Sequence, residues 1–154
     1  MKNKFKYACF LTVIIFILST LSFSFASSKG IKWYTYKQGI ELSKIEGKKI
    51  FLYFYADWCT YCKKMEKETF NDDSVVSYLN NNFIPIKVNS DIDVKTALSF
   101  GVRGLPSTWF IEGDGERISN LPGFIAADTL LNILKYINTD SYKKVSFREF
   151  MQEI

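Results

Sequence analysis

Histidine is absent from this sequence of 154 residues. Its absence excludes Ser-His-Asp and Cys-His nucleophilic mechanisms and every metal site that needs an imidazole ligand. Cysteine is scarce and odd in number, so that one of Cys9, Cys59 and Cys62 lacks an intramolecular partner if all three are retained. What is present is 47% hydrophobic and 23% charged residues, a composition that excludes a disordered or fibrous chain and fits a single globular domain.

The first 26 residues have the three parts of a secretory signal peptide. Lysines precede an apolar run over residues 8–18, and Ser24-Phe25-Ala26 places small residues at the cleavage positions. The alternative is an uncleaved anchor, because residues 8–26 would form a helix of about 28 Å, long enough to cross a bilayer. In both cases we expect an exported, periplasmic or extracytoplasmic protein, which stays tethered to the membrane if the signal is not cleaved.

Export changes the charge and the cysteine count. The net charge of +4 includes the three lysines of the signal segment, so the exported part is nearly neutral and has no basic patch. We therefore exclude nucleic acid as a partner. Cys9 leaves with the signal, and Cys59 and Cys62 enter an oxidising compartment.

The exported part alternates between strand-like and helix-like segments. Residues 50–55 are six apolar or aromatic residues in a row, which indicates a central parallel strand buried on both faces. This pattern predicts one α/β domain over residues 27–138, with helices on both faces of the sheet. The other expected strands are 31–36, 83–88, 108–111 and 117–120, and the expected helices are 38–46, 59–70, 73–79, 94–100 and 128–137.

Side chains at helix ends and faces give further expectations. We expect Ile40, Leu42 and Ile45 to lie on the buried side of the first helix. Asp73 and Asp128 are expected to cap the third and last of these helices.

Cys59 and Cys62 form a C-x-x-C motif where the central strand meets a helix. The free N–H groups and the positive dipole end of the first helical turn stabilise a thiolate at Cys59, and Lys63 adds to this effect. We therefore expect Cys59 to attack a substrate disulfide and Cys62 to resolve the mixed disulfide. Glu66 either tunes Cys62 or belongs to a solvated helix face.

Three other uses of the motif are weaker. A structural disulfide would close a very short loop, which adds little stability. Zinc needs two further soft ligands that the exported part lacks, and covalent haem attachment needs a histidine where Lys63 stands. We expect no bound metal and no cofactor beyond the disulfide, although two thiolates would also suffice to carry Cu(I) in a non-enzymatic binding module.

From about residue 33 to 137 the sequence resembles the thioredoxin superfamily. Residues 56–63, Ala-Asp-Trp-Cys-Thr-Tyr-Cys-Lys, are similar to its active-site segment, and residues 101–108, Gly-Val-Arg-Gly-Leu-Pro-Ser-Thr, to its second signature. The resemblance implies the thioredoxin fold with a central mixed sheet, and a cis bond before Pro106. It also implies a substrate groove framed by Trp58, Tyr61, Leu105, Pro106 and Gly123.

The segments 57–59, 62–63 and 66–72 resemble more closely the exported thioredoxin-like C-terminal domain of the transmembrane thiol:disulfide interchange protein. This resemblance implies a reductase or electron relay for protein thiols and disulfides, with a membrane-embedded electron donor. The alternative within the same chemistry is a disulfide oxidase or isomerase. We expect a monomer.

The sequence also departs from thioredoxin itself. Tyr53 stands where thioredoxin has a buried acid, so that proton transfer from Cys62 must use another group or water. Thr60 and Tyr61 replace Gly-Pro between the cysteines, and Lys67 replaces a proline that kinks the helix. These changes argue against a direct link to cytosolic thioredoxin reductase.

Residues 139–154 form a C-terminal extension without a thioredoxin counterpart. Ser146 and Glu149 have the spacing of a capping box, and Phe147, Phe150, Met151 and Ile154 follow helical spacing. A helix of about eight residues is marginal alone. We expect it to dock on the domain's own surface, the alternative being a site for a partner.

Overall fold

The computed structural model describes residues 30–153, so the predicted signal segment and Ile154 lie outside the described residues. None of the described helices is both long and apolar enough to cross a membrane. The elements follow the predicted alternation of strands and helices. In chain order they are α2 (Tyr36–Glu46), β1 (Ile50–Tyr55), α3 (Thr60–Glu68), α4 (Asp73–Asn82), β2 (Ile84–Asn89), α5 (Val94–Ser99), β3 (Ser107–Ile111), β4 (Arg117–Pro122), α6 (Ala127–Asn138), the 3-10 helix η1 (Ser141–Lys143) and α7 (Phe147–Phe150).

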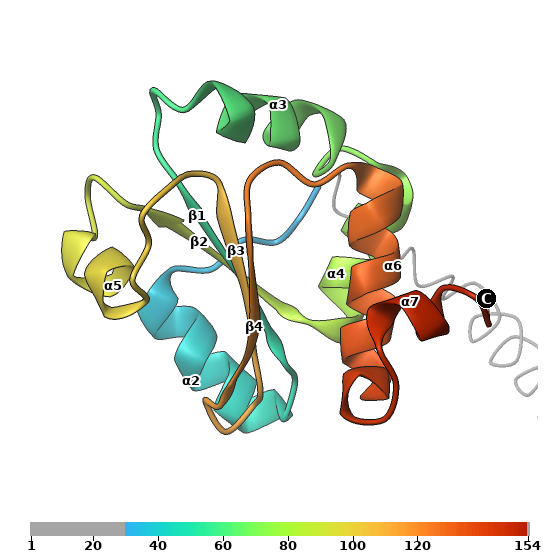
Figure 1. Cartoon of the computed structure of the whole chain (residues 1–154). Coiled ribbons are helices and arrows are strands. Elements are labelled where there is room, and N and C mark those ends of the chain that lie inside the picture. Colours follow the sequence, from blue (N-terminus) through green and yellow to red (C-terminus); the bar gives the residue numbers. More distant parts are fainter. Residues whose placement is uncertain (1–29, 154) are drawn as a thin grey trace, which may run out of the picture.

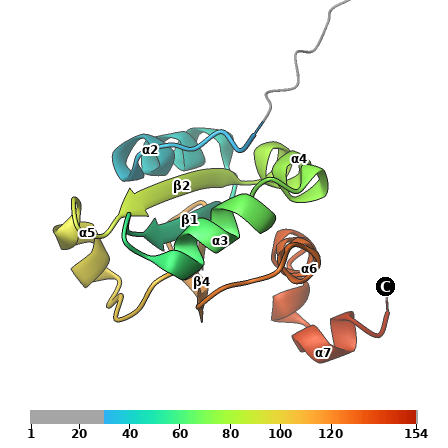
Figure 2. The same cartoon turned by 90° about the horizontal axis from the view of Figure 1, so that it is seen from above.

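The sheet is mixed, as predicted, and has the strand order β2-β1-β3-β4 (Figure 1). β1 pairs in parallel with β2 and antiparallel with β3, and the predicted strands β3 and β4 form an antiparallel hairpin. Helices cover both faces of the sheet (Figure 2). These features are those of a thioredoxin fold.

β1 is buried on both faces because its side chains alternate between two hydrophobic cores. Phe51 and Tyr53 face the core that contains both cysteines and the buried side chains of α3, α4 and α6. Leu52 and Phe54 face the core that α2 and α5 cover. The unbroken apolar run therefore marks the centre of the sheet, directly before the C-x-x-C motif.

The N-terminal part differs from expectation in two ways. The predicted edge strand 31–36 is reduced to one bridge between Tyr34 and Ile86, because Thr35 caps α2 with a capping box and the helix begins at Tyr36. The prediction that Ile45 is buried is wrong, since its side chain is 81% exposed. Ile40 and Leu42 do pack against the core, as predicted. The fully buried residues of α2 are Gly39 and Ser43, and at Gly39 the helix approaches Ile86 of β2 too closely for a larger side chain.

Two helix caps also differ from the prediction. Asp72, and not Asp73, caps α4 by accepting hydrogen bonds from the N–H groups of Ser74 and Val75. α6 begins after Ala126 without a side-chain cap, and Asp128 lies within its first turn. A carboxylate there still interacts favourably with the helix dipole. The predicted end of the first helix at residue 46 is confirmed, and Gly47 caps α2 with φ 64°.

The C-terminal extension lies against α6 (Figure 1). The Tyr136 ring of α6 contacts Phe147 and Phe150, and its hydroxyl donates to the carbonyl of Val145 at 2.6 Å. The Ser146–Glu149 capping box is present, but α7 spans four residues and not about eight. Phe150 at the end of α7 is buried, whereas Met151 directly after it is exposed, so the helix packs on the domain with a single turn.

An ionic cluster ties the extension to the sheet. Lys49 and Lys143 each pair with both Glu112 and Asp140, at distances of 2.8–3.4 Å. Burial alone would raise the pKa of Glu112, but hydrogen bonds from Lys143 and Tyr142 and the charge of Lys49 lower it overall. Hydrogen bonds from Lys143 and Lys49 also lower the pKa of Asp140.

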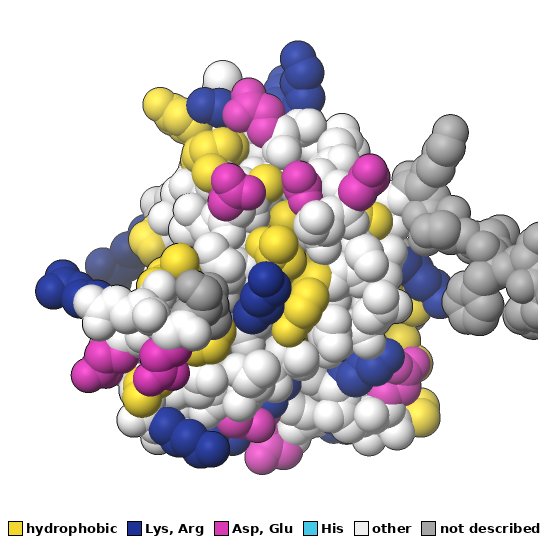
Figure 3. All heavy atoms as spheres, turned by 90° about the vertical axis from the view of Figure 1, so that its right-hand side faces the viewer, with side chains coloured by type: hydrophobic (Ala, Val, Ile, Leu, Met, Phe, Trp, Pro, Cys, Tyr) yellow, Lys and Arg dark blue, Asp and Glu magenta, His cyan; other side chains and the backbone are white. Residues whose placement is uncertain are grey.

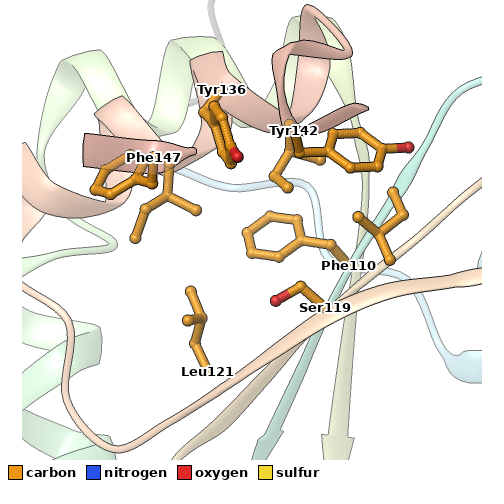
Figure 4. Close-up of a pocket in the computed structure, with 9 residues that line it drawn as sticks. Phe110, Ser119, Leu121, Tyr136, Tyr142 and Phe147 are labelled. Carbon is orange, nitrogen blue, oxygen red and sulfur yellow. The ribbon is translucent and has the colours of Figure 1, made fainter. Parts of the chain in front are cut away.

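Between the extension, α6 and the hairpin lies a cavity of about 360 Å³. Figure 4 shows the aromatic rings that surround it, with Ser119 and Leu121 of β4 on the opposite side. The residues that line the cavity are Phe110, Ile118, Ser119, Leu121, Ile133, Tyr136, Ile137, Tyr142 and Phe147.

The surface around α6 has no single sign of charge. Acidic and basic side chains are interspersed on this face of the molecule (Figure 3).

Candidate active site

The two cysteines lie at the start of α3 and form a disulfide, with their Cα atoms 5.2 Å apart. The chain turns after β1 through a hydrogen bond from the Cys59 N–H to the Ala56 carbonyl. Cys59 is the N-cap residue of α3, and its Sγ accepts a hydrogen bond from the Cys62 N–H at 3.1 Å. Both cysteines are buried, and Cys59 is slightly more exposed (4%) than Cys62 (1%).

This geometry favours negative charge on the Cys59 sulfur. The sulfur occupies the position in which an N-cap oxygen normally accepts from the first turn of a helix. When the disulfide is reduced, the same N–H donor and the helix dipole stabilise a thiolate there. The more exposed of the two cysteines is thus also the one whose sulfur the helix start favours as a thiolate.

The proline signature and the glycine of the predicted groove lie at the same end of the sheet as the dithiol. The Leu105–Pro106 bond is cis, and the Gly123 N–H donates to the Pro106 carbonyl at 2.7 Å. In the sheet register, Ser107 pairs with both Phe54 and Pro122, which places these loops beside the end of β1 (Figure 1). Leu105 packs against the core cluster that contains both cysteines.

The aromatic residues beside the cysteines project outward. Trp58 is 69% exposed and Tyr61 is 63% exposed. The Trp58 indole N–H donates to the Asp91 carboxylate at 2.8 Å, a contact across 33 positions of sequence. Sequence reasoning missed Asp91, because nothing in the local pattern connects it with the motif.

Tyr53 lies behind the dithiol with its side chain fully buried. Its hydroxyl donates to the carbonyl of Cys62 at 3.4 Å. Burial raises the pKa of Tyr53 far above the ordinary value, and the charge of Glu66 raises it further. A neutral hydrogen-bond donor thus stands where the resemblance to thioredoxin would place a buried acid.

The two charged residues predicted as tuning groups have different surroundings. Lys63 is an exposed residue of α3. Glu66 is half-buried and pairs with Lys87 of β2 at 2.8 Å, and the same lysine lies 4.2 Å from the centre of the Tyr55 ring. Among residues 30–153 there is no group of three or more metal-ligating side chains.

A dithiol–disulfide pair at a helix N-terminus, beside a cis-proline on a mixed four-stranded sheet, defines a thiol:disulfide oxidoreductase-like protein of thioredoxin fold. Residues 36–138 match the family described as the thioredoxin-like domain, and the chain belongs to this family.

Curated relatives support the same assignment. The chain is 34% identical over 108 residues to the thiol:disulfide interchange protein DsbD of Yersinia pestis (strain Pestoides F), a match that covers 67% of this chain and 18% of that protein. It is 36% identical over 96 residues to the protein of the same name from Haemophilus ducreyi, covering 59% of this chain and 17% of the relative. The matched region is thus less than a fifth of these relatives.

Solved structures agree with the fold. A thioredoxin from Thermus thermophilus superposes with a TM-score of 0.64 at 25% identity, covering 70% of this chain and 87% of the other. The oxidised C-terminal domain of DsbD from Neisseria meningitidis superposes with a TM-score of 0.57 at 25% identity, covering 66% of this chain and 91% of that domain. The fold and the family that the sequence predicted are confirmed.

Proposed function

We propose that this chain is an exported thiol:disulfide oxidoreductase that works as a reductase or electron relay on protein disulfides. The observation that carries the proposal is the Cys59 sulfur, which caps α3 and accepts the Cys62 N–H. The similarity to thiol:disulfide interchange proteins supports electron transfer to protein substrates and a membrane-embedded electron donor. The signal-like segment over residues 1–26 supports export.

The reaction needs only sulfur. The reduced Cys59 thiolate attacks one sulfur of a substrate disulfide, so that a Cys59–substrate disulfide forms and the second substrate sulfur leaves as a thiolate that takes up a proton. Cys62, deprotonated, then attacks the Cys59 sulfur, and the first substrate sulfur leaves. The substrate gains two electrons, and the protein returns to the Cys59–Cys62 disulfide seen in the structure.

The remaining predicted site residues have a binding role in this proposal. Trp58, Tyr61, Leu105, Pro106 and Gly123 would frame the contact with an extended substrate segment. The disulfide itself is the redox group, so no further cofactor is required. Lys63 and Glu66 would adjust the charge around the dithiol.

Trapping experiments test the two cysteine roles. Cys62→Ser should accumulate mixed disulfides through Cys59, because the resolving thiol is gone, whereas Cys59→Ser should trap few. Both variants keep one thiol and nearly the same side-chain volume, so each serves as the control of the other. Non-reducing gel electrophoresis followed by mass spectrometry of exported proteins measures the outcome. Equal trapping by the two variants would contradict the role assignment.

The reduction potential tests the direction of electron flow. Thiol:disulfide proteins range from about −120 mV for a strong oxidant to about −270 mV for thioredoxin. A reductase or relay should lie toward the lower value. A potential near the upper value would replace the reductase proposal with an oxidase.

A further inference from the structure

Most exposed large hydrophobic side chains of residues 30–153 come from the segments that follow β1 and β2. Seven such side chains are exposed, and five of them come from the two short segments 58–61 and 92–98. Ile92 and Leu98 are 81% and 72% exposed, so they contribute little to the core. We call these five residues the α5-side patch, which consists of Trp58, Tyr61, Ile92, Val94 and Leu98.

The two segments of the patch are held together. The Trp58 indole donates to Asp91, next to Ile92, and the Asn89 amide donates to Asp57, next to Trp58. Val94 and Leu98 are four residues apart on α5 and therefore project from the same side of that helix. Both cartoon views place the loop that leads from β2 into α5 beside the loop that leads from β1 into α3 (Figures 1 and 2).

The chemistry of the site explains why this surface must be covered during turnover. Cys59 is only 4% exposed, so a second disulfide can reach its sulfur only when the molecule that carries it lies against the surface around Cys59. The patch is continuous with that surface through Trp58. Removing its apolar side chains from water favours association in proportion to the area covered.

Acidic side chains border the patch. Asp93 lies in one of the two segments, and Asp57 and Asp91 directly precede them. The nearby basic residues are Lys95 of α5 and the pair Lys63 and Lys64 that follows Cys62. Of these, Lys64 lies over the Phe124 ring and pairs with Glu68. Each of the three acids accepts a hydrogen bond that fixes its position, from Asn89, Trp58 and the Thr96 N–H respectively. Fixed negative charge around an apolar centre favours a partner with basic residues around an apolar surface.

We propose that the α5-side patch is the docking surface for a protein substrate whose disulfide lies on an apolar surface bordered by lysine or arginine. The proposal rests on the proposed function, because the substrate is the molecule that Cys59 attacks. Ile92 and Leu98 select protein substrates over small disulfides, since a small molecule can reach Cys59 without covering α5.

Exchange kinetics with three probes test this docking surface. The probes are oxidised glutathione and two disulfide-bonded apolar peptides, one flanked by lysines and the other by glutamates. The double variant Ile92→Ser, Leu98→Ser should react about tenfold or more slowly with the lysine-flanked peptide and within about twofold of wild type with glutathione. Wild type should prefer the lysine-flanked peptide, and salt should reduce that preference.

Ile45→Ser is the matched control, because Ile45 is as exposed as Ile92 but lies on α2. It should leave all three rates unchanged, and the double variant should keep the wild-type reduction potential. Equal losses with glutathione and peptide, no loss with either, or the same loss in Ile45→Ser would overturn the docking surface. Wild-type protein that exchanges with none of the probes would instead refute the proposed function.

Discussion

Replacement of Gly39 by alanine should destabilise the protein, although helix propensity alone gives the opposite sign. Gly39 lies inside α2, where alanine is favoured over glycine by about 1 kcal/mol. A Cβ atom at this position would lie 2.3 Å from Cγ1 and 2.4 Å from Cδ1 of Ile86, whose side chain is fully buried. Overpacking of a core costs about 1–3 kcal/mol, and after the gain in helix propensity we expect a net loss of up to about 2 kcal/mol in the free energy of unfolding.

A double-mutant cycle in urea, followed by tryptophan fluorescence, measures this effect. Ile86→Ala alone should cost about 2–5 kcal/mol, because it leaves a cavity. With the Ile86 branch removed, Gly39→Ala should become neutral or stabilising, which gives a coupling energy of at least about 1 kcal/mol. A stabilising Gly39→Ala single variant, or additive effects of the two changes, would refute the reasoning from close contact.

Two further predictions concern titratable groups. Glu112 and Asp140 have pKa values below 4.5 and 3.8, so the stability that their ion pairs provide is present above those values and is lost as the pH falls through the lowered pKa values. The midpoint of thermal unfolding should therefore fall between pH 7 and pH 3, and it should fall less in the Glu112→Gln variant. The same pH dependence in that variant would contradict a stabilising role of the ionic cluster. Tyr53→Phe should cost less than about 1 kcal/mol and leave the pH profile of disulfide exchange unchanged, because the Tyr53 hydroxyl stays neutral and loses one long hydrogen bond; a shifted profile would mean that this hydroxyl carries the proton of Cys62.

The parts of the fold that the sequence predicted are those in which local pattern and tertiary environment agree. The apolar run of β1 is informative because it can be satisfied only at the centre of a sheet covered on both faces. The C-x-x-C motif is informative because its position after that strand places Cys59 at a helix N-terminus. Both features depend on neighbouring residues and not on distant ones.

The wrong and missing predictions concern residues whose position depends on contacts with distant parts of the sequence. Ile45 fits a helical apolar stripe, but α2 approaches the sheet at Gly39, where Ile86 of β2 lies directly against the helix backbone. Asp91 is fixed to Trp58 by the packing of two loops that sequence spacing does not relate. Ile92, Val94 and Leu98 of the α5-side patch were missed for the same reason, because their exposure becomes visible only in the folded chain.

The direction of electron flow depends on how strongly the protein stabilises its own thiolate. A hydrogen bond to the Cys59 sulfur favours the reduced state, and a reduced state that is too stable makes a dithiol an oxidant. Here the hydrogen bond comes from a single backbone N–H, and the buried group behind the dithiol is a neutral tyrosine hydroxyl bonded to a carbonyl. Asp57 and Lys63 flank the dithiol segment with opposite charges, and Glu66 is paired with Lys87, so these charges largely offset one another beside the thiolate. In the proposed reductase this balance would let the dithiol give up its electrons, and a backbone amide would perform the task that an imidazolium performs in a Cys-His pair.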